Sequence, residues 1–172
     1  MSLDHRNGRR GKSAAAKEIG ELLRGNATGY AVIDLDAIAK CETDPPVPGR
    51  FESALLLANL AAIWPNYQRY GVRFVVLARA VVNKSELGDL RACIPRSHWT
   101  VCRLDSPAPL VEQRLRMREP GMAQEFLLRV SPALAAEMAA EAIEDFRVTN
   151  ADRPLTGVAS DVLHEWSQRL PK

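Results

Sequence analysis

The chain has 172 residues with a formal net charge of +2, and 47% of its residues are hydrophobic. This length suits one domain with one core, and so small a net charge does not favour a nucleic acid or a membrane surface as partner. The longest apolar run, 54–64, is far shorter than the roughly 20 residues that span a bilayer. Three scattered cysteines without a C-x-x-C pair indicate free thiols. We therefore predict a single cytoplasmic domain over 1–172, a monomer or homodimer with a small-molecule substrate.

Predicted helices and strands alternate along the chain. Apolar residues at helical spacing predict helices, whereas short runs that are apolar throughout predict strands covered on both faces. Ser131 and Pro132 have the residue types of an N-cap and a first turn, and predict the start of a separate helix. In chain order we expect a helix at 14–24, a strand at 30–38, a loop at 41–49, a helix at 50–71, a strand at 72–82, a helix at 84–94, a strand at 98–107, helices at 109–119 and 133–145, a strand at 146–150 and a helix at 154–166.

This alternation predicts the fold class. Strands that are apolar on both faces, with helices between them, favour a parallel sheet covered on both sides. We therefore expect an α/β protein, a three-layer, doubly wound parallel sheet of about five strands. No linker marks a second domain.

The stretch Gly11-Lys12-Ser13, followed by a helix, matches the second half of the phosphate-loop pattern G-x-x-x-x-G-K-[ST]. In such a loop, backbone N–H groups and the helix N-terminus hold phosphate. Lys12 would reach the β- and γ-phosphates of ATP, and Ser13 would hold Mg²⁺. The first glycine of the pattern falls on Arg6, and Gly8 lies inside the loop. The alternative interpretation is a basic helix N-terminus without a ligand.

Two carboxylates, Asp34 and Asp36, close the strand predicted at 30–38. Residues i and i+2 of an extended segment point the same way, and ligands gather at the carboxyl ends of parallel strands. One carboxylate, Asp34, would help to hold Mg²⁺, while the other would accept a proton from a substrate hydroxyl. The alternative is that this pair is a helix N-cap and a surface acid.

Arginines dominate the segment 114–129. Arg114 and Arg118 lie four residues apart on one helix face, and guanidinium groups suit phosphoryl oxygens. A break at residues 120–121 is typical of a mobile lid, so we expect 114–129 to be a lid. A solvated basic face is the alternative. The strand-end turn at 148–154, with Asn150, could receive adenine on backbone groups.

Four features occur in this order along the chain: Gly-Lys-Ser before a helix, two carboxylates after a strand, a basic lid segment, and a strand-end turn before the last helix. In this order of features the chain resembles the small P-loop kinases, which include adenylate, shikimate and gluconate kinases, chloramphenicol phosphotransferase and adenylylsulfate kinase. The resemblance is closer to bacterial P-loop proteins that are described as ATP-binding or adenylylsulfate kinase-like, and it covers nearly all of the chain from Gly11. It implies ATP, Mg²⁺ and phosphoryl transfer to a small hydroxyl-bearing acceptor. It matches Gly11, Lys12 and Ser13 to the phosphate loop, Asp34 and Asp36 to the D-x-D of kinases that phosphorylate hydroxyls, and Arg114 and Arg118 to the lid arginines. Together with the reasoning from the residues, we expect phosphate binding by Gly8, Gly11, Lys12 and Ser13, metal binding by Ser13 and Asp34, catalysis by Lys12, Asp34, Asp36, Arg114 and Arg118, and nucleotide contacts also by Arg114 and Asn150.

The sequence departs from this pattern at three places. The loop lacks its first glycine, and the strand predicted at 72–82 offers only Arg79 near its end, where the pattern has a second acid. In the family a central strand leads into the loop, whereas only residues 1–7 precede Gly8 here. We expect an N-terminus that is shortened or altered relative to the natural protein. The alternatives are a short substitute strand at 1–7, or a partner chain that fills the gap. A nucleotide-binding module without turnover is the alternative function.

Overall fold

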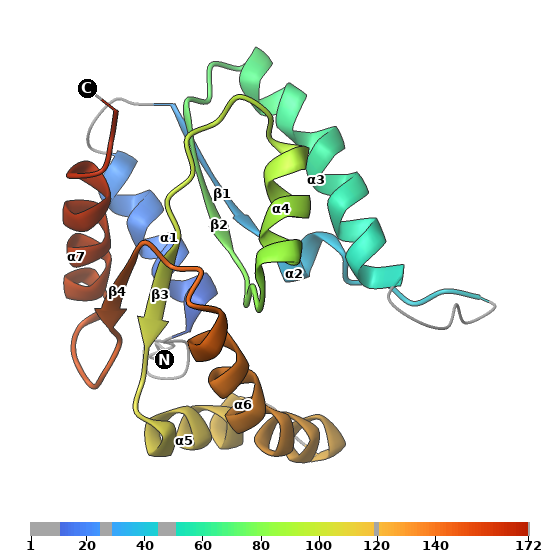
Figure 1. The fold of residues 1–172 in the computed structure, drawn as a ribbon, viewed down its shortest axis with the longest axis vertical. Coiled ribbons are helices and arrows are strands. Elements are labelled where there is room, and N and C mark those ends of the chain that lie inside the picture. Colours follow the sequence, from blue (N-terminus) through green and yellow to red (C-terminus); the bar gives the residue numbers. More distant parts are fainter. Residues whose placement is uncertain (1–10, 25–28, 45–50, 119–120, 172) are drawn as a thin grey trace, which may run out of the picture.

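The computed structural model describes residues 11–24, 29–44, 51–118 and 121–171. Gly8 therefore lies outside the described residues, as does the side chain of Arg118. Seven helices and four strands occur in the described part, and Figure 1 shows their arrangement. They are α1 (Lys12–Arg24), β1 (Tyr30–Asp34), α2 (Leu35–Ile38), α3 (Phe51–Arg69), β2 (Phe74–Ala78), α4 (Lys84–Cys93), β3 (Cys102–Asp105), α5 (Ala108–Arg118), α6 (Gly121–Glu141), β4 (Phe146–Thr149) and α7 (Leu155–Ser167).

The strands form two parallel pairs. β1 pairs with β2, so that Tyr30 lies opposite Phe74, and β3 pairs with β4, so that Cys102 lies opposite Phe146. The prediction of an α/β fold with parallel strands is therefore confirmed. Within the described ranges no strand joins β2 to β3, so the five-stranded sheet stays a prediction.

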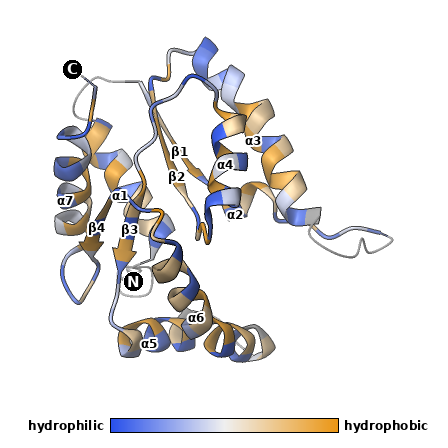
Figure 2. Ribbon diagram, viewed as in Figure 1, coloured by the Kyte–Doolittle hydropathy of each residue, from blue (hydrophilic) through white to orange (hydrophobic). Residues whose placement is uncertain are grey.

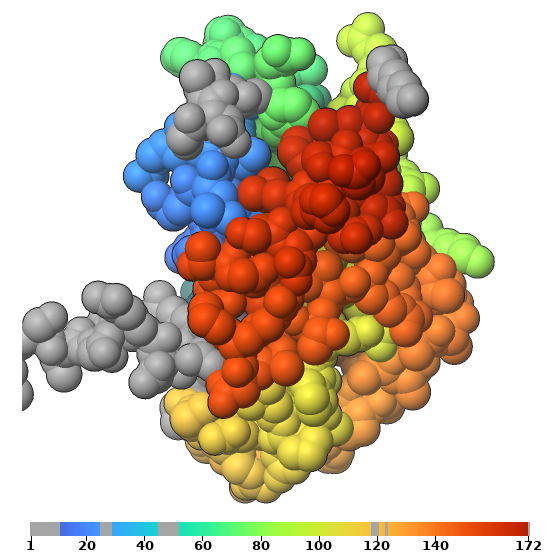
Figure 3. All heavy atoms as spheres, turned by 90° about the vertical axis from the view of Figure 1, so that its left-hand side faces the viewer, coloured from blue at the N-terminus to red at the C-terminus, as the bar shows by residue number. Residues whose placement is uncertain are grey.

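Helices cover both faces of the β1–β2 pair. On one face Ile19 and Leu23 of α1 pack with Val76 of β2 and Ala159 of α7, and Figure 3 shows α1 and α7 side by side. On the other face Leu56 and Leu60 of α3 belong to the core cluster that also contains residues of α4. Figure 2 shows apolar residues along both strands of this pair. The layered arrangement follows from strands that are apolar on both faces.

A close backbone approach aligns the start of β1 with β2. The carbonyl of Gly29 accepts hydrogen bonds from the N–H groups of Arg73 (2.8 Å) and Phe74 (3.2 Å). A Cβ atom at position 29 would lie 2.2 Å from the carbonyl oxygen of Gly71. Glycine is thus required here because any side chain would collide with backbone.

Two prolines that could end helices lie inside them. α3 continues through Pro65 and ends at Arg69, and Gly71 then takes a positive φ of 77°. The predicted helix start at Ser131 and Pro132 is wrong, because α6 runs without interruption from Gly121 to Glu141. A proline in a helix removes one hydrogen bond, and the cap signal is too local to reveal that the helix begins ten residues earlier.

Among the described residues no helix is both long and apolar enough to cross a membrane.

Candidate functional site

One cavity of about 960 Å³ lies at the carboxyl ends of the strands and extends between β2 and β3. Parallel strands end at the same edge of a sheet, where loops from several strands can form one site. The cavity therefore collects residues that are far apart in the sequence. The predicted site residues that line it are Gly11, Lys12, Ser13, Asp34, Asp36, Arg114 and Asn150.

The N-terminus of α1 forms one wall of this cavity. The helix begins at Lys12, and the N–H of Ala15 donates to the carbonyl of Gly11 at 3.0 Å. Ala15 and Ala16 are buried, whereas Lys12 is exposed and Ser13 half-buried. The first N–H groups of a helix have no acceptor within it, and the helix dipole adds positive charge there. This wall thus presents an ammonium group, a hydroxyl and the positive end of a helix.

Asp34 and Asp36 both line the cavity, but not in the predicted extended geometry. Asp34 is the last residue of β1 and the N-cap of α2, and its Oδ1 accepts the N–H groups of Asp36 (3.2 Å) and Ala37 (3.4 Å). Asp36 lies in the first turn of α2. The expectation that both lie on one extended segment was wrong, because the capping bonds start a helix at Leu35. The alternative interpretation, an N-cap beside a surface acid, describes the local geometry correctly.

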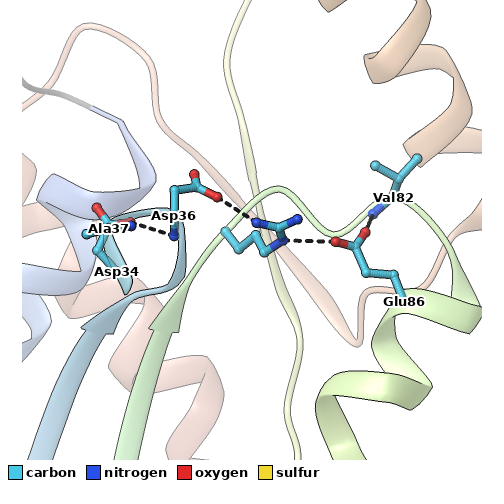
Figure 4. A network of polar contacts seen from close by, with 6 residues as sticks. Asp34, Asp36, Ala37, Val82 and Glu86 are labelled. Carbon is cyan, nitrogen blue, oxygen red and sulfur yellow. Dashed lines mark hydrogen bonds and ion pairs between the residues drawn. The ribbon is translucent and has the colours of Figure 1, made fainter. Parts of the chain in front are cut away.

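Arg79 connects Asp36 to a second carboxylate. Its Nη1 lies 2.8 Å from Asp36 Oδ1 and its Nε donates to Glu86 Oε1 at 2.9 Å (Figure 4). Glu86 Oε2 also accepts the N–H of Val82 at 2.9 Å. Glu86 was not among the site residues predicted from the sequence. Its N–H donates to the side chain of Asn83, the N-cap of α4, at 2.9 Å. The pattern Asn-x-x-Glu before a helix is the local signal that could have placed this carboxylate.

Arg114 fastens α5 to the ends of β3 and β4. Its guanidinium donates to Ser106 Oγ (3.1 Å) and to the carbonyl of Ala151 (3.3 Å). Ser106 Oγ donates to the carbonyl of Asn150 (2.8 Å), and the Asn150 N–H donates to the carbonyl of Asp105 (2.7 Å). Asn150 is only 3% exposed. In this structure Arg114 and Asn150 therefore hold together the turn on which the sequence placed adenine.

The predicted lid, 114–129, comprises the end of α5 and the first turns of α6. Met117, Met122 and Phe126 are exposed there, and the guanidinium carbon of Arg129 lies 5.8 Å from the centre of the Phe126 ring. α5 ends at Arg118 and α6 begins at Gly121, which has a positive φ of 63°. Residue 120 of the break predicted at 120–121 lies outside the described residues, so the lid stays a prediction.

A charged cluster lies along β3 and before β4. Arg103 Nε lies 2.8 Å from Asp105 Oδ1, and Arg147 Nε donates to Glu144 Oε1 at 2.6 Å. Burial of the Glu144 carboxylate opposes ionisation, but a backbone hydrogen bond and the guanidinium groups of Arg147 and Arg103 outweigh it, so the pKa of Glu144 lies below its usual value. Cys102 lies on the opposite face of β3. Burial of its thiol is the larger cause, and the charge of Asp105 the smaller cause, of a pKa that is raised to about 12.

Comparison with known proteins gives a likeness in fold. No protein-family model matches the chain, and no curated protein matches it either. An unliganded sugar kinase from Janibacter sp. HTCC2649 has a similar structure, with a TM-score of 0.62 and 18% sequence identity over 94% of this chain and 90% of that chain. At this identity the likeness establishes the fold alone. The chain has a mixed α/β fold that is similar to the fold of this sugar kinase.

Proposed function

We propose that the protein is an ATP-dependent phosphotransferase that acts on a hydroxyl group of a small molecule. One observation carries this proposal: a single cavity brings Lys12 and Ser13, at the positive end of α1, to the same place as the carboxylates of Asp34 and Asp36. Transfer of a phosphoryl group to a hydroxyl needs groups that bind the anionic phosphates and a group that accepts the proton of the hydroxyl. The fold shared with a sugar kinase supports the same class of reaction.

In this proposal Lys12 and the first N–H groups of α1 bind the phosphates of ATP. Asp36 accepts the proton of the acceptor hydroxyl, whose oxygen attacks the γ-phosphorus while the bond to ADP breaks. Asp36 is the better base of the two carboxylates because its side chain is 68% exposed, whereas Asp34 Oδ1 is occupied by two N–H groups. Arg114, and Arg118 on the same helix, would stabilise the transferred phosphoryl group.

The donor set of the cavity suits Mg²⁺. Ser13 offers a hydroxyl and Asp34 a carboxylate, and both line the same cavity. Mg²⁺ prefers oxygen ligands and is commonly held by one or two protein groups together with substrate phosphates. When bound, the ion would neutralise charge on the phosphates. Ser13 and Asp34 are the residues that we propose as its ligands.

Binding of Mg·ATP tests the first part of the proposal. At a concentration 100-fold above Kd, a ligand stabilises a protein by about 2.7 kcal/mol, which raises Tm by roughly 5–10 °C for a domain of this size. Lys12→Ala should abolish that rise. Lys40→Ala is the matched control, because Lys40 is exposed and does not line the cavity. An unchanged rise in Lys12→Ala would exclude the phosphate-binding assignment.

Turnover tests the second part. Asp36→Asn should abolish ATP consumption in the presence of acceptors while Mg·ATP still raises Tm. A panel of sugars and other small polyols is the first set of acceptors to measure, given the sugar kinase of similar fold.

A nucleotide-binding module without turnover is the second candidate function. Arg79 favours it, because this cation occupies the end of β2 and pairs with the proposed base, Asp36. If the protein is such a module, Mg·ATP should still raise Tm. ATP consumption in the presence of acceptors should then be the same for the natural chain and for Asp36→Asn.

A further inference from the structure

Helix α6 is apolar on two opposite faces. Its only charged residues are Glu125, Arg129, Glu137 and Glu141, and none of its described residues is buried. Its inner face contributes Ala135 and Met138 to the cavity wall. A helix that is apolar all round normally lies inside a protein, yet α6 lies beside α5 at the lower end of the molecule in Figure 1. Its outer face therefore lacks, within the described part of the chain, the partner that its composition favours.

An exposed stripe runs along this outer face. Residues three or four positions apart are neighbours on a helix surface. The members of the outer stripe follow this spacing and are all exposed: Met122, Phe126, Arg129, Ala133, Ala136 and Ala140. Met122 is 88% exposed and Phe126 is 54% exposed. With 3.6 residues per turn, the outer stripe lies on the opposite side of α6 from the residues that line the cavity, so a ligand in the cavity would leave it uncovered.

Two opposite charges accompany the large apolar residues of the outer stripe. Glu125 and Arg129 lie four residues apart, a spacing at which an ion pair can form within a helix. The guanidinium carbon of Arg129 instead lies 5.8 Å from the centre of the Phe126 ring, and no described residue forms an ion pair with the Glu125 carboxylate. Both charges are therefore available to a partner.

The order of these residues makes the outer stripe complementary to itself. When two copies of α6 pair antiparallel about a two-fold axis at residue 127, Glu125 of each copy lies level with Arg129 of the other. The same axis brings the two Phe126 side chains together and sets Met122 beside the small residue Ala133 of the other copy. A two-fold pair uses one surface twice. A parallel pair would instead set like charges level with each other, which is unfavourable.

We propose that the outer stripe is the interface of a homodimer, in which two copies of α6 pack antiparallel with Phe126 at the two-fold axis. Ion pairs between Glu125 of one copy and Arg129 of the other set the register, and Met122 and Phe126 supply the apolar contact. The two helices overlap over residues 121–133, which is about 20 Å of helix. One such helix pair is smaller than a standard interface of roughly 1,200–2,000 Å², so the dimer dissociates on dilution. This inference does not rest on the proposed kinase activity.

Sedimentation velocity of the full-length chain over a concentration series tests the interface. The natural chain should sediment as a monomer when dilute and as a dimer when concentrated. Glu125→Arg and Arg129→Glu should each weaken the dimer about tenfold or more, because two like-charge pairs replace two opposite-charge pairs. An equal mixture of the two variants should recover the dimer, since each pair then joins an arginine to a glutamate. The double substitution in one chain should recover it for the same reason.

Glu137→Arg is the matched control. It makes the same charge change on an exposed position of α6 but lies beyond the overlap, so it should leave the dimer unchanged. Phe126→Ala should weaken the dimer without a change of charge. Exposed substitutions rarely alter a fold, and circular dichroism checks each variant. The proposal would be overturned by a natural chain that stays monomeric at every concentration, by a dimer that neither charge reversal weakens, or by a mixture that does not recover the dimer.

Discussion

The guanidinium of Arg79 lies 2.8 Å from the carboxylate of Asp36, although the two residues are 43 positions apart in the sequence. This ion pair joins the end of β2 to the first turn of α2, and Glu86 holds the same guanidinium from α4. Three segments at the edge of the cavity are thereby fixed to one another. The pairing also places a cation beside the residue that we propose as catalytic base.

Replacement of Arg79 by methionine should lower the free energy of unfolding by about 1–3 kcal/mol, because the partly buried Glu86 loses a charged hydrogen-bond partner. Asp36 is largely exposed and contributes little to that loss. Urea denaturation measures the change. Arg116→Met is the control, since Arg116 and Glu112 form an exposed pair whose loss should change stability by less than about 0.5 kcal/mol. Equal losses in the two variants would contradict a structural role for Arg79.

Substitutions at Asp34 should separate capping from ligand binding. Asparagine still accepts the two N–H groups of α2, whereas alanine does not, so Asp34→Ala should cost about 1 kcal/mol of stability and Asp34→Asn much less. Both should weaken the Mg²⁺-dependent part of ATP binding, because both remove the charge. Thermal unfolding with and without Mg·ATP measures the two effects together. A full Mg·ATP response in Asp34→Asn would rule out Asp34 as a metal ligand.

Glu144 should make stability depend on pH at the acid end. Its pKa is lowered in the folded protein, so its contribution is fully present above the unfolded pKa of about 4.3 and is lost as pH falls through the folded value. Glu144→Gln should therefore be less stable at pH 7 and lose less stability between neutral and acid pH. Chemical denaturation at several pH values provides the measurement. Parallel curves for the two proteins would show that Glu144 does not carry this dependence.

The cysteines should differ in reactivity. Cys41 is exposed, whereas burial raises the pKa of Cys102 to about 12, and the thiolate is the reactive form. At pH 8 an aromatic disulfide reagent should modify Cys41 rapidly and Cys102 only after unfolding. Cys41→Ser should remove the rapid phase, while Cys102→Ser should leave it intact. A rapid phase that survives Cys41→Ser would contradict this assignment.

Much of the fold was predictable because its signals are local. Apolar runs and periodicity predicted a strand at 30–38, which contains β1, and a helix at 14–24, which lies within α1. The predictions at Asp36 and at Pro132 were wrong because the local sequence there is compatible with two structures. A carboxylate after a strand can continue the strand or cap a helix, and a Ser-Pro pair can begin a helix or lie within one.

The sequence by itself predicted most of the helices and strands, that the strands are parallel, and which residues carry charge near a helix N-terminus. These properties depend on side chains within a few positions of one another. Only the tertiary structure decided that Asp36 pairs with Arg79, that Arg114 binds the turn after β4, and that no strand within the described ranges joins β2 to β3. Strand order and long-range contacts are not encoded in local periodicity, because they depend on how whole elements pack against each other in space.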